Sequence, residues 1–278
     1  MRPTVFPPDS TDSRRFFLRI KRPIAFTLAS TNHGSMLVNR FDFHKTKQVT
    51  YGVGYQILES SEFDAQEVDL AIKLLGSRKD NFGENVIAID CGANIGVHTI
   101  EWAKAMFGWG KVISIEAQER IYYALAGNIA INNCFNASAI YAAVGAVDGF
   151  IYVPEPDYMM PGSFGSLEIQ NKNNNEFIGQ TIDYSEEKCT KTKMIAIDSL
   201  NLERLDFIKI DIEGMEVDAL RGAESSLRKF KPQMLVEKIK SNEVQILEIL
   251  DKLEYKVFSY GNNLIAIHNT DPALKILI

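Results

Sequence analysis

The sequence predicts an α/β fold built on a mostly parallel sheet with helices on both faces. From residue 85 onward, short apolar runs alternate with helical segments, which is typical of parallel strands joined by crossover helices. The apolar runs are continuous rather than alternating, as expected of strands buried on both faces of a sheet. With 278 residues and 46% hydrophobic composition, the chain is long enough for one large domain with a small extension.

The elements follow from these runs in order. The continuous apolar runs predict strands over 86–90, 112–115, 139–144, 194–197, 207–212 and 233–236. The periodicity of the intervening segments predicts helices over 95–107, 119–132, 216–230 and 242–253. Two last runs, 255–260 and 264–268, flank a Gly261-Asn262 turn and predict an antiparallel hairpin at one edge of the sheet.

The first 80 residues differ in character from the rest. They hold β-like runs at 36–43 and 48–58 and a predicted helix over 64–75. We therefore expect a small mixed extension over 1–80 and a main domain over 81–278. The main domain is interrupted by a polar insert over 157–193, and an insert of that length is usually functional or disordered.

Composition narrows the class of protein. With 30 Lys and Arg against 36 Asp and Glu, the net charge is −6, which argues against nucleic acid as a partner. Three distant cysteines without a C-x-x-C pair favour a reducing compartment. No apolar run approaches the ~18 residues of a membrane span.

The N-terminal residues 13–18 look like a twin-arginine signal, but charged residues interrupt the apolar region that should follow, so we expect a cytoplasmic protein. The oligomeric state is not predicted.

A glycine-rich turn follows the first predicted strand. It reads Asp90-Cys91-Gly92-Ala93-Asn94-Ile95-Gly96 and leads into a helix, where free N–H groups can meet a ligand. Glu116 ends the next strand, 20 residues after Gly96, and an acid at that place can accept hydrogen bonds from both hydroxyls of a ribose. Together the turn and the acid indicate an adenosine-type ligand.

The turn departs from the G-x-G-x-x-G pattern of dinucleotide-binding proteins. Asn94 stands where that pattern has a glycine, and polar or acidic groups suit a sulfonium ligand better than a diphosphate. The sequence therefore favours S-adenosylmethionine over NAD. A nucleotide-dependent oxidoreductase and a non-catalytic scaffold with the same fold are the alternatives.

Two longer motifs resemble the FkbM family of S-adenosylmethionine-dependent methyltransferases. The first is V-I-A-I-D-C-G-A-N-I-G at 86–96, followed by V-H-T, and the second is F-I-K-I-D-I-E-G-M-E at 207–216. The resemblance covers about residues 60–270. It implies a class I, Rossmann-like methyltransferase with a seven-stranded sheet, acting on a hydroxyl of a sugar, glycan or small secondary metabolite.

The resemblance also implies residue roles. Asp90, Gly92, Asn94 and Gly96 would line the amino-acid end of the cofactor, and Glu116 would hold its ribose. The adenine would lie near Ala142 and Ala143, at the end of the third strand. Asp211 and Glu213 would lie beside the transferred methyl group.

A hydroxyl acceptor benefits from a general base, and four residues are candidates. They are His98 in the first helical turn, Asp211 and Glu213 at the end of the strand predicted over 207–212, and Glu237 after the strand predicted over 233–236. Asp211 and Glu237 could also bind a divalent cation, because hard oxygen ligands suit Mg²⁺. The sequence identifies no third ligand, so no metal is predicted. We expect the extension and the insert to form the acceptor pocket.

Overall fold

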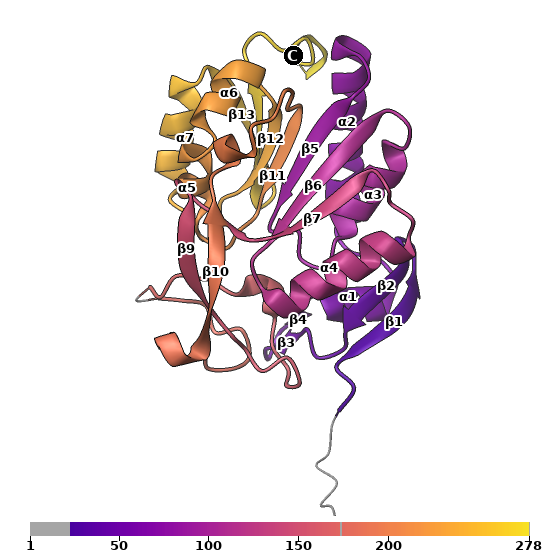
Figure 1. The fold of residues 1–278 in the computed structure, drawn as a ribbon, viewed down its shortest axis with the longest axis vertical. Coiled ribbons are helices and arrows are strands. Elements are labelled where there is room, and N and C mark those ends of the chain that lie inside the picture. The colour runs from indigo at the N-terminus through magenta and orange to yellow at the C-terminus, as the bar shows by residue number, and fades with distance from the viewer. Residues whose placement is uncertain (1–22, 173, 278) are drawn as a thin grey trace, which may run out of the picture.

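A computed structural model describes residues 23–172 and 174–277 of the chain (Figure 1). The arginine pair of the signal-like segment at 13–18 lies outside the described residues. Within the described ranges, no helix has both the length and the apolar character needed to cross a membrane.

The centre of the molecule is a seven-stranded sheet with the order β13-β14-β12-β11-β5-β6-β7. All neighbouring pairs are parallel except those made by β14, which runs antiparallel to β12 and β13. The strands are β5 (Val86–Cys91), β6 (Gly110–Glu116), β7 (Ala137–Tyr141), β11 (Phe207–Ile210), β12 (Gln233–Glu237), β13 (Tyr255–Tyr260) and β14 (Asn263–His268). This arrangement confirms the predicted α/β class, the seven strands and the antiparallel hairpin at one edge.

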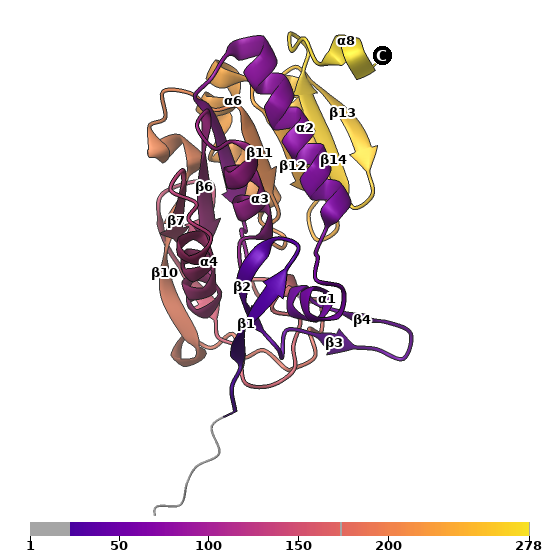
Figure 2. The same cartoon turned by 90° about the vertical axis from the view of Figure 1, so that its right-hand side faces the viewer.

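Helices cover both faces of the sheet (Figures 1 and 2). One face carries α2 (Ala65–Phe82), α3 (Val97–Ala105) and α4 (Glu119–Ile131), and the other carries α5 (Glu216–Arg221), α6 (Glu224–Phe230) and α7 (Glu243–Lys252). Successive residues of a strand enter opposite cores: Phe207 packs in the cluster with Trp102, whereas Ile208 packs in the cluster with Leu227. This two-sided burial explains the continuous apolar runs of the sequence.

The remaining elements gather at the end of the sheet where the parallel strands terminate (Figure 1). They comprise β1 (Phe26–Thr31), β2 (Gly34–Asn39), β3 (His44–Lys45), β4 (Thr50–Tyr51), α1 (Val53–Ser60), β8 (Ala143–Val144), β9 (Gly149–Pro154), β10 (Cys189–Ile195) and short 3₁₀ turns at Phe164–Ser166 and Glu186–Lys188. A third 3₁₀ turn, Ile197–Leu200, and the terminal α8 (Leu274–Leu277) complete the described chain.

Three segments differ from the sequence prediction. The run 48–58 is not a strand: only Thr50–Tyr51 pairs, and α1 follows because Val53 and Ile57, one helical turn apart, are both buried. The run 139–144 divides between β7 of the main sheet and β8 of a small sheet. The run 194–197 was expected in the main sheet, but β10 instead lies between β8 and β9 in the three-stranded sheet.

Two helices also differ in extent from the prediction. The helix predicted over 64–75 continues to Phe82. The helix predicted over 216–230 breaks at Gly222, where a β-carbon would overlap the backbone of Gly145. Close packing at this glycine thus involves the loop after β8.

Candidate functional site

Two adjoining hollows lie at the carboxyl ends of the parallel strands. The first has a volume of about 220 Å³ and is bounded by the N-terminal extension, the insert and the ends of β11 and β12. The second lies beside the ends of β6 and β7. Both are lined by Gly92, Asn94, Gly165, Asp211 and Glu213, so the loop after β5 forms part of the wall between them.

The turn after β5 is shaped by its glycines and by one asparagine. Gly92, Asn94 and Gly96 have φ values of +78°, +50° and +92°. A β-carbon at Gly92 would overlap the carbonyl oxygen of Asp211, and one at Gly96 would lie 2.6 Å from the Leu125 side chain. Gly92 therefore permits close approach of two strand ends, whereas the need for glycine at Gly96 comes from backbone conformation and core packing. Gly96 lines neither hollow.

Asp90 lies beneath this turn rather than in a hollow. Its side chain is 1% exposed, and its Oδ2 accepts a hydrogen bond of 2.7 Å from the Thr99 hydroxyl. Its position therefore favours a role in holding the loop and the start of α3 together.

Glu116 lines the second hollow and is tied to the loop after β5. Its Oε2 accepts from the Asn94 N–H at 2.9 Å, and its Oε1 accepts from the Gln118 N–H at 2.8 Å. Burial raises the pKa of Glu116 to about 7, although these N–H groups oppose the shift. Each carboxylate oxygen retains further acceptor capacity toward a ligand. Ala142 and Ala143 line the same hollow, so the residues expected near ribose and adenine are brought together.

Three carboxylates meet where β11 and β12 end. Suitable oxygen atoms of Asp211, Glu213 and Glu237 lie within 4.8 Å of one another. The Lys209 ammonium lies 2.7 Å from Asp211, and the Lys240 ammonium lies 2.6 Å from Glu213. Two of the three carboxylates are thus neutralised by lysines, which disfavours a metal ion at this place.

Glu237 is the carboxylate of this group without a lysine partner within ion-pair distance in the described chain. Burial and the Asp211 carboxylate raise the pKa of Glu213 to about 8 and that of Glu237 to about 9. Because Lys240 stabilises the ionised form of Glu213, we assign the proton of this group at neutral pH to Glu237.

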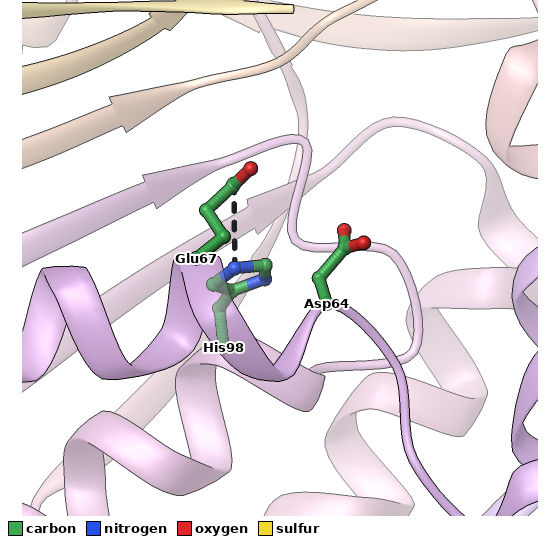
Figure 3. Close-up of side chains that lie close together, drawn as sticks. All are labelled: Asp64, Glu67 and His98. Carbon is green, nitrogen blue, oxygen red and sulfur yellow. Dashed lines mark ion pairs between the residues drawn. The ribbon is translucent and has the colours of Figure 1, made fainter. Parts of the chain in front are cut away.

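His98 lies in the first turn of α3 and faces two acids that the sequence analysis missed (Figure 3). Its Nε2 is 3.4 Å from Oε1 of Glu67, and Asp64 completes a group whose ligand atoms lie within 4.8 Å of one another. His98 and Asp64 line the first hollow. The D-x-x-E spacing at the start of α2 was the available signal, but such spacing ordinarily indicates helix capping. Asp64 makes no such side-chain cap.

Comparison with known proteins decides the family. A family model described as the methyltransferase FkbM domain matches residues 90–260. The chain belongs to the FkbM family. The matched range includes every expected cofactor and catalytic residue, and it leaves out Asp64 and Glu67.

Several proteins that are similar to this chain are named as methyltransferases. The chain is 25% identical over 157 residues to "Methyltransferase 1" of Beauveria bassiana (strain ARSEF 2860), covering 51% of this chain and 60% of that protein. It is 24% identical over 164 residues to "Methyltransferase sdnD" of Sordaria araneosa, covering 52% and 62%. A crystal structure of the methyltransferase FkbM from Methylobacillus flagellatus KT is similar at 17% identity and a TM-score of 0.46, covering 66% of this chain and 44% of that one. The chain therefore spans less than two thirds of the curated relatives that it matches.

Proposed function

We propose that the protein is an S-adenosylmethionine-dependent methyltransferase that methylates a hydroxyl of a sugar, glycan or small secondary metabolite. The observation that carries this proposal is the pair of hollows that meet at Gly92, Asn94 and Asp211. One hollow has the acid and small residues that suit an adenosine, and the other has the polar side chains that suit a hydroxylated acceptor. Family membership supports the reaction class.

The residues present fit S-adenosylmethionine. Glu116, Ala142 and Ala143 would hold the adenosine part, and Gly92 and Asn94 would contact the amino-acid end, with Asp90 and Gly96 supporting the loop. When bound, the cofactor supplies an electrophilic methyl group on a cationic sulfur. The lining of the first hollow carries four carboxylates and one lysine, Lys209. Lysines pair with Asp211 and Glu213, and Glu237 is protonated, so the described lining stays mildly acidic and offers a diphosphate no unpaired lysine. This balance favours S-adenosylmethionine over NAD.

The first hollow suits a polar acceptor. Tyr51, Gln56, Ser163 and Ser166 contribute hydrogen-bonding groups from the extension and the insert. Such groups can orient several hydroxyls at once, which supports a sugar-like acceptor over an apolar one.

The strand-end carboxylates can remove the acceptor proton. A base with a raised pKa has a stronger affinity for the proton of a weakly acidic hydroxyl, provided that it is ionised when the acceptor binds. Glu237 has a pKa raised further than that of Glu213, to about 9, so it becomes available as the base when it ionises as the pH rises toward that value. Asp211 and Glu213 hold lysines that fix the shape of the site. The Nε2 of His98 lies 3.4 Å from Glu67 and not among the strand-end carboxylates, so His98 is the less suitable base.

Calorimetric titration with S-adenosylhomocysteine tests the cofactor, with NAD as the parallel ligand. We expect micromolar binding of the first and none of the second. Binding of NAD alone would support the oxidoreductase alternative, and binding of neither would support the scaffold.

A methyl-transfer screen over sugars, glycans and hydroxylated metabolites then tests the acceptor. Asp211→Asn should lower turnover there far more than it lowers cofactor affinity.

A further inference from the structure

Asp64, Glu67 and His98 form a cluster that the proposed reaction does not use. Two members come from the N-terminal end of α2 and the third comes from the first turn of α3 (Figure 3). Their ligand atoms lie within 4.8 Å of one another. A histidine and two carboxylates that converge in this way resemble a metal-binding set.

The histidine supplies evidence that is independent of the two acids. The His98 side chain is 7% exposed, and its Nε2 makes no hydrogen bond to any described residue, although Oε1 of Glu67 lies 3.4 Å away. A buried polar atom with an unmet hydrogen-bonding capacity is costly, and a metal ion between these two atoms would satisfy both of them. The edge-on contact with the Trp102 ring, at 5.6 Å between centroids, helps to hold the imidazole in this orientation.

The geometry between His98 and Glu67 fits a shared ion better than a direct hydrogen bond. Their separation of 3.4 Å exceeds the range of about 2.7–3.2 Å that is usual for an N–H···O bond. Two ligands that bind one zinc ion tetrahedrally at about 2.0–2.1 Å lie roughly 3.3 Å apart. The other oxygen of Glu67 accepts from Asn263 at 2.7 Å, which orients the carboxylate as supporting hydrogen bonds do in metal sites.

We propose that Asp64, Glu67 and His98 bind one divalent transition-metal ion on the wall of the first hollow. Imidazole favours transition metals over Mg²⁺, and the carboxylates are compatible with Mn²⁺ or Zn²⁺. The ion would balance the two carboxylates. Lys209, which lines the same hollow, is engaged with Asp211 at 2.7 Å.

The position of the proposed metal site determines how an ion would reach it and which helices the ion would join. Asp64 and His98 line the first hollow, so an ion can enter from it and can keep a coordination position open toward it. The ion would also join α2 to α3, the helix that follows the loop after β5. The site does not depend on the proposed methyl transfer, because that proposal assigns the role of base to Glu237 and not to any of these three side chains.

Direct metal titration tests the site without any activity assay. We would titrate the full chain, stripped with chelator, with Mn²⁺ and Zn²⁺ by calorimetry, and compare Asp64→Asn, Glu67→Gln and His98→Asn. We expect one ion per chain and at least a tenfold loss of affinity in each variant. Asp69→Asn is the matched control, because Asp69 is an exposed acid on the same helix. It should bind as the wild type does.

Glu237→Gln separates this site from the strand-end carboxylates and should also bind the ion normally. Absence of stoichiometric binding to the wild type would overturn the proposal. So would an ion whose affinity falls in Glu237→Gln and persists in His98→Asn. Thermal melting shows whether each variant folds. Asp64→Asn keeps the test decisive if the buried His98 variant fails to fold, because Asp64 is an exposed residue.

Discussion

Replacement of Glu116 by alanine should destabilise the protein more at pH 5 than at pH 8. The carboxylate accepts hydrogen bonds from the Asn94 and Gln118 N–H groups. Alanine leaves both donors without a partner, at a cost of about 1–3 kcal/mol each when no water replaces the carboxylate. At pH 8 alanine also removes a buried charge that itself destabilises the fold. At pH 5 the folded carboxyl is protonated, so this compensation is lost.

The sign follows from the raised pKa. The folded value of about 7 lies above the model value of 4.5, so the folded state binds a proton that the unfolded state has released. Glu116 therefore stabilises the fold most at low pH, and its contribution falls as pH rises from about 4.5 through 7. Integration between pH 5 and pH 8 gives a difference of about 2 kcal/mol. The destabilisation caused by Glu116→Ala should be larger at pH 5 by that amount.

Urea unfolding at the two pH values measures this difference. Glu116→Gln should show the same pH dependence with a smaller loss, because its amide oxygen still accepts one N–H. Glu248→Ala, an exposed change on α7, should stay within about 0.5 kcal/mol at both pH values. Calorimetry with S-adenosylhomocysteine should show at least a tenfold loss of affinity for both Glu116 variants. Equal destabilisation by Glu116→Ala at pH 5 and pH 8 would refute the buried-charge reasoning.

Three further predictions concern the loop, the base and the core. Gly92→Ala should lower the melting temperature and abolish cofactor binding, because its β-carbon would overlap the Asp211 backbone; Gly76→Ala, with open space around it in α2, should leave cofactor binding unchanged. Glu237→Gln should remove a rising limb of kcat/KM near pH 8–9, since the folded pKa of about 9 leaves the base protonated below it; a profile identical to the wild type's would contradict this role. Arg78→Met should cost about 3–5 kcal/mol in urea unfolding, because it leaves the buried Asp271 carboxylate without a guanidinium partner, whereas Asp206 keeps Arg204. A loss below about 1 kcal/mol would contradict that account.

The sequence predicted the sheet well because burial on both faces leaves a local signature. The strand at 86–90 is continuous in apolar residues, and the structure places β5 in the interior of the sheet, between β11 and β6. The error at 48–58 has a tertiary origin. The Asp42 carboxylate accepts from the Gly54 N–H at the start of α1, and that contact crosses 12 residues. Its contribution to the local structure is invisible to a pattern of apolar residues.

The candidate site likewise contains some residues whose positions the sequence predicts and others whose positions it does not. The turn after β5 and Glu116 follow successive strands of a parallel sheet, so their proximity could be predicted from their order alone. Glu67 owes its place to α2 and to a hydrogen bond from Asn263, almost 200 residues later in the chain. Lys240 likewise reaches Glu213 from the loop after β12. Contacts between residues so far apart in the chain cannot be predicted from local sequence patterns and become visible only in the folded structure.

The choice of acceptor should reside in the segments that close the first hollow. The Asp42 carboxylate accepts from the N–H groups of Gly54 and Phe164, at 3.0 and 2.9 Å, and thereby joins the extension to the insert. The Lys240 ammonium donates to the Ser166 carbonyl at 2.8 Å, which fixes the insert against the end of β12. The extension lies outside the family-matched range of 90–260, whereas the residues around the second hollow lie inside it. Exchange of residues 42–67 between relatives should therefore change the acceptor while cofactor affinity is retained.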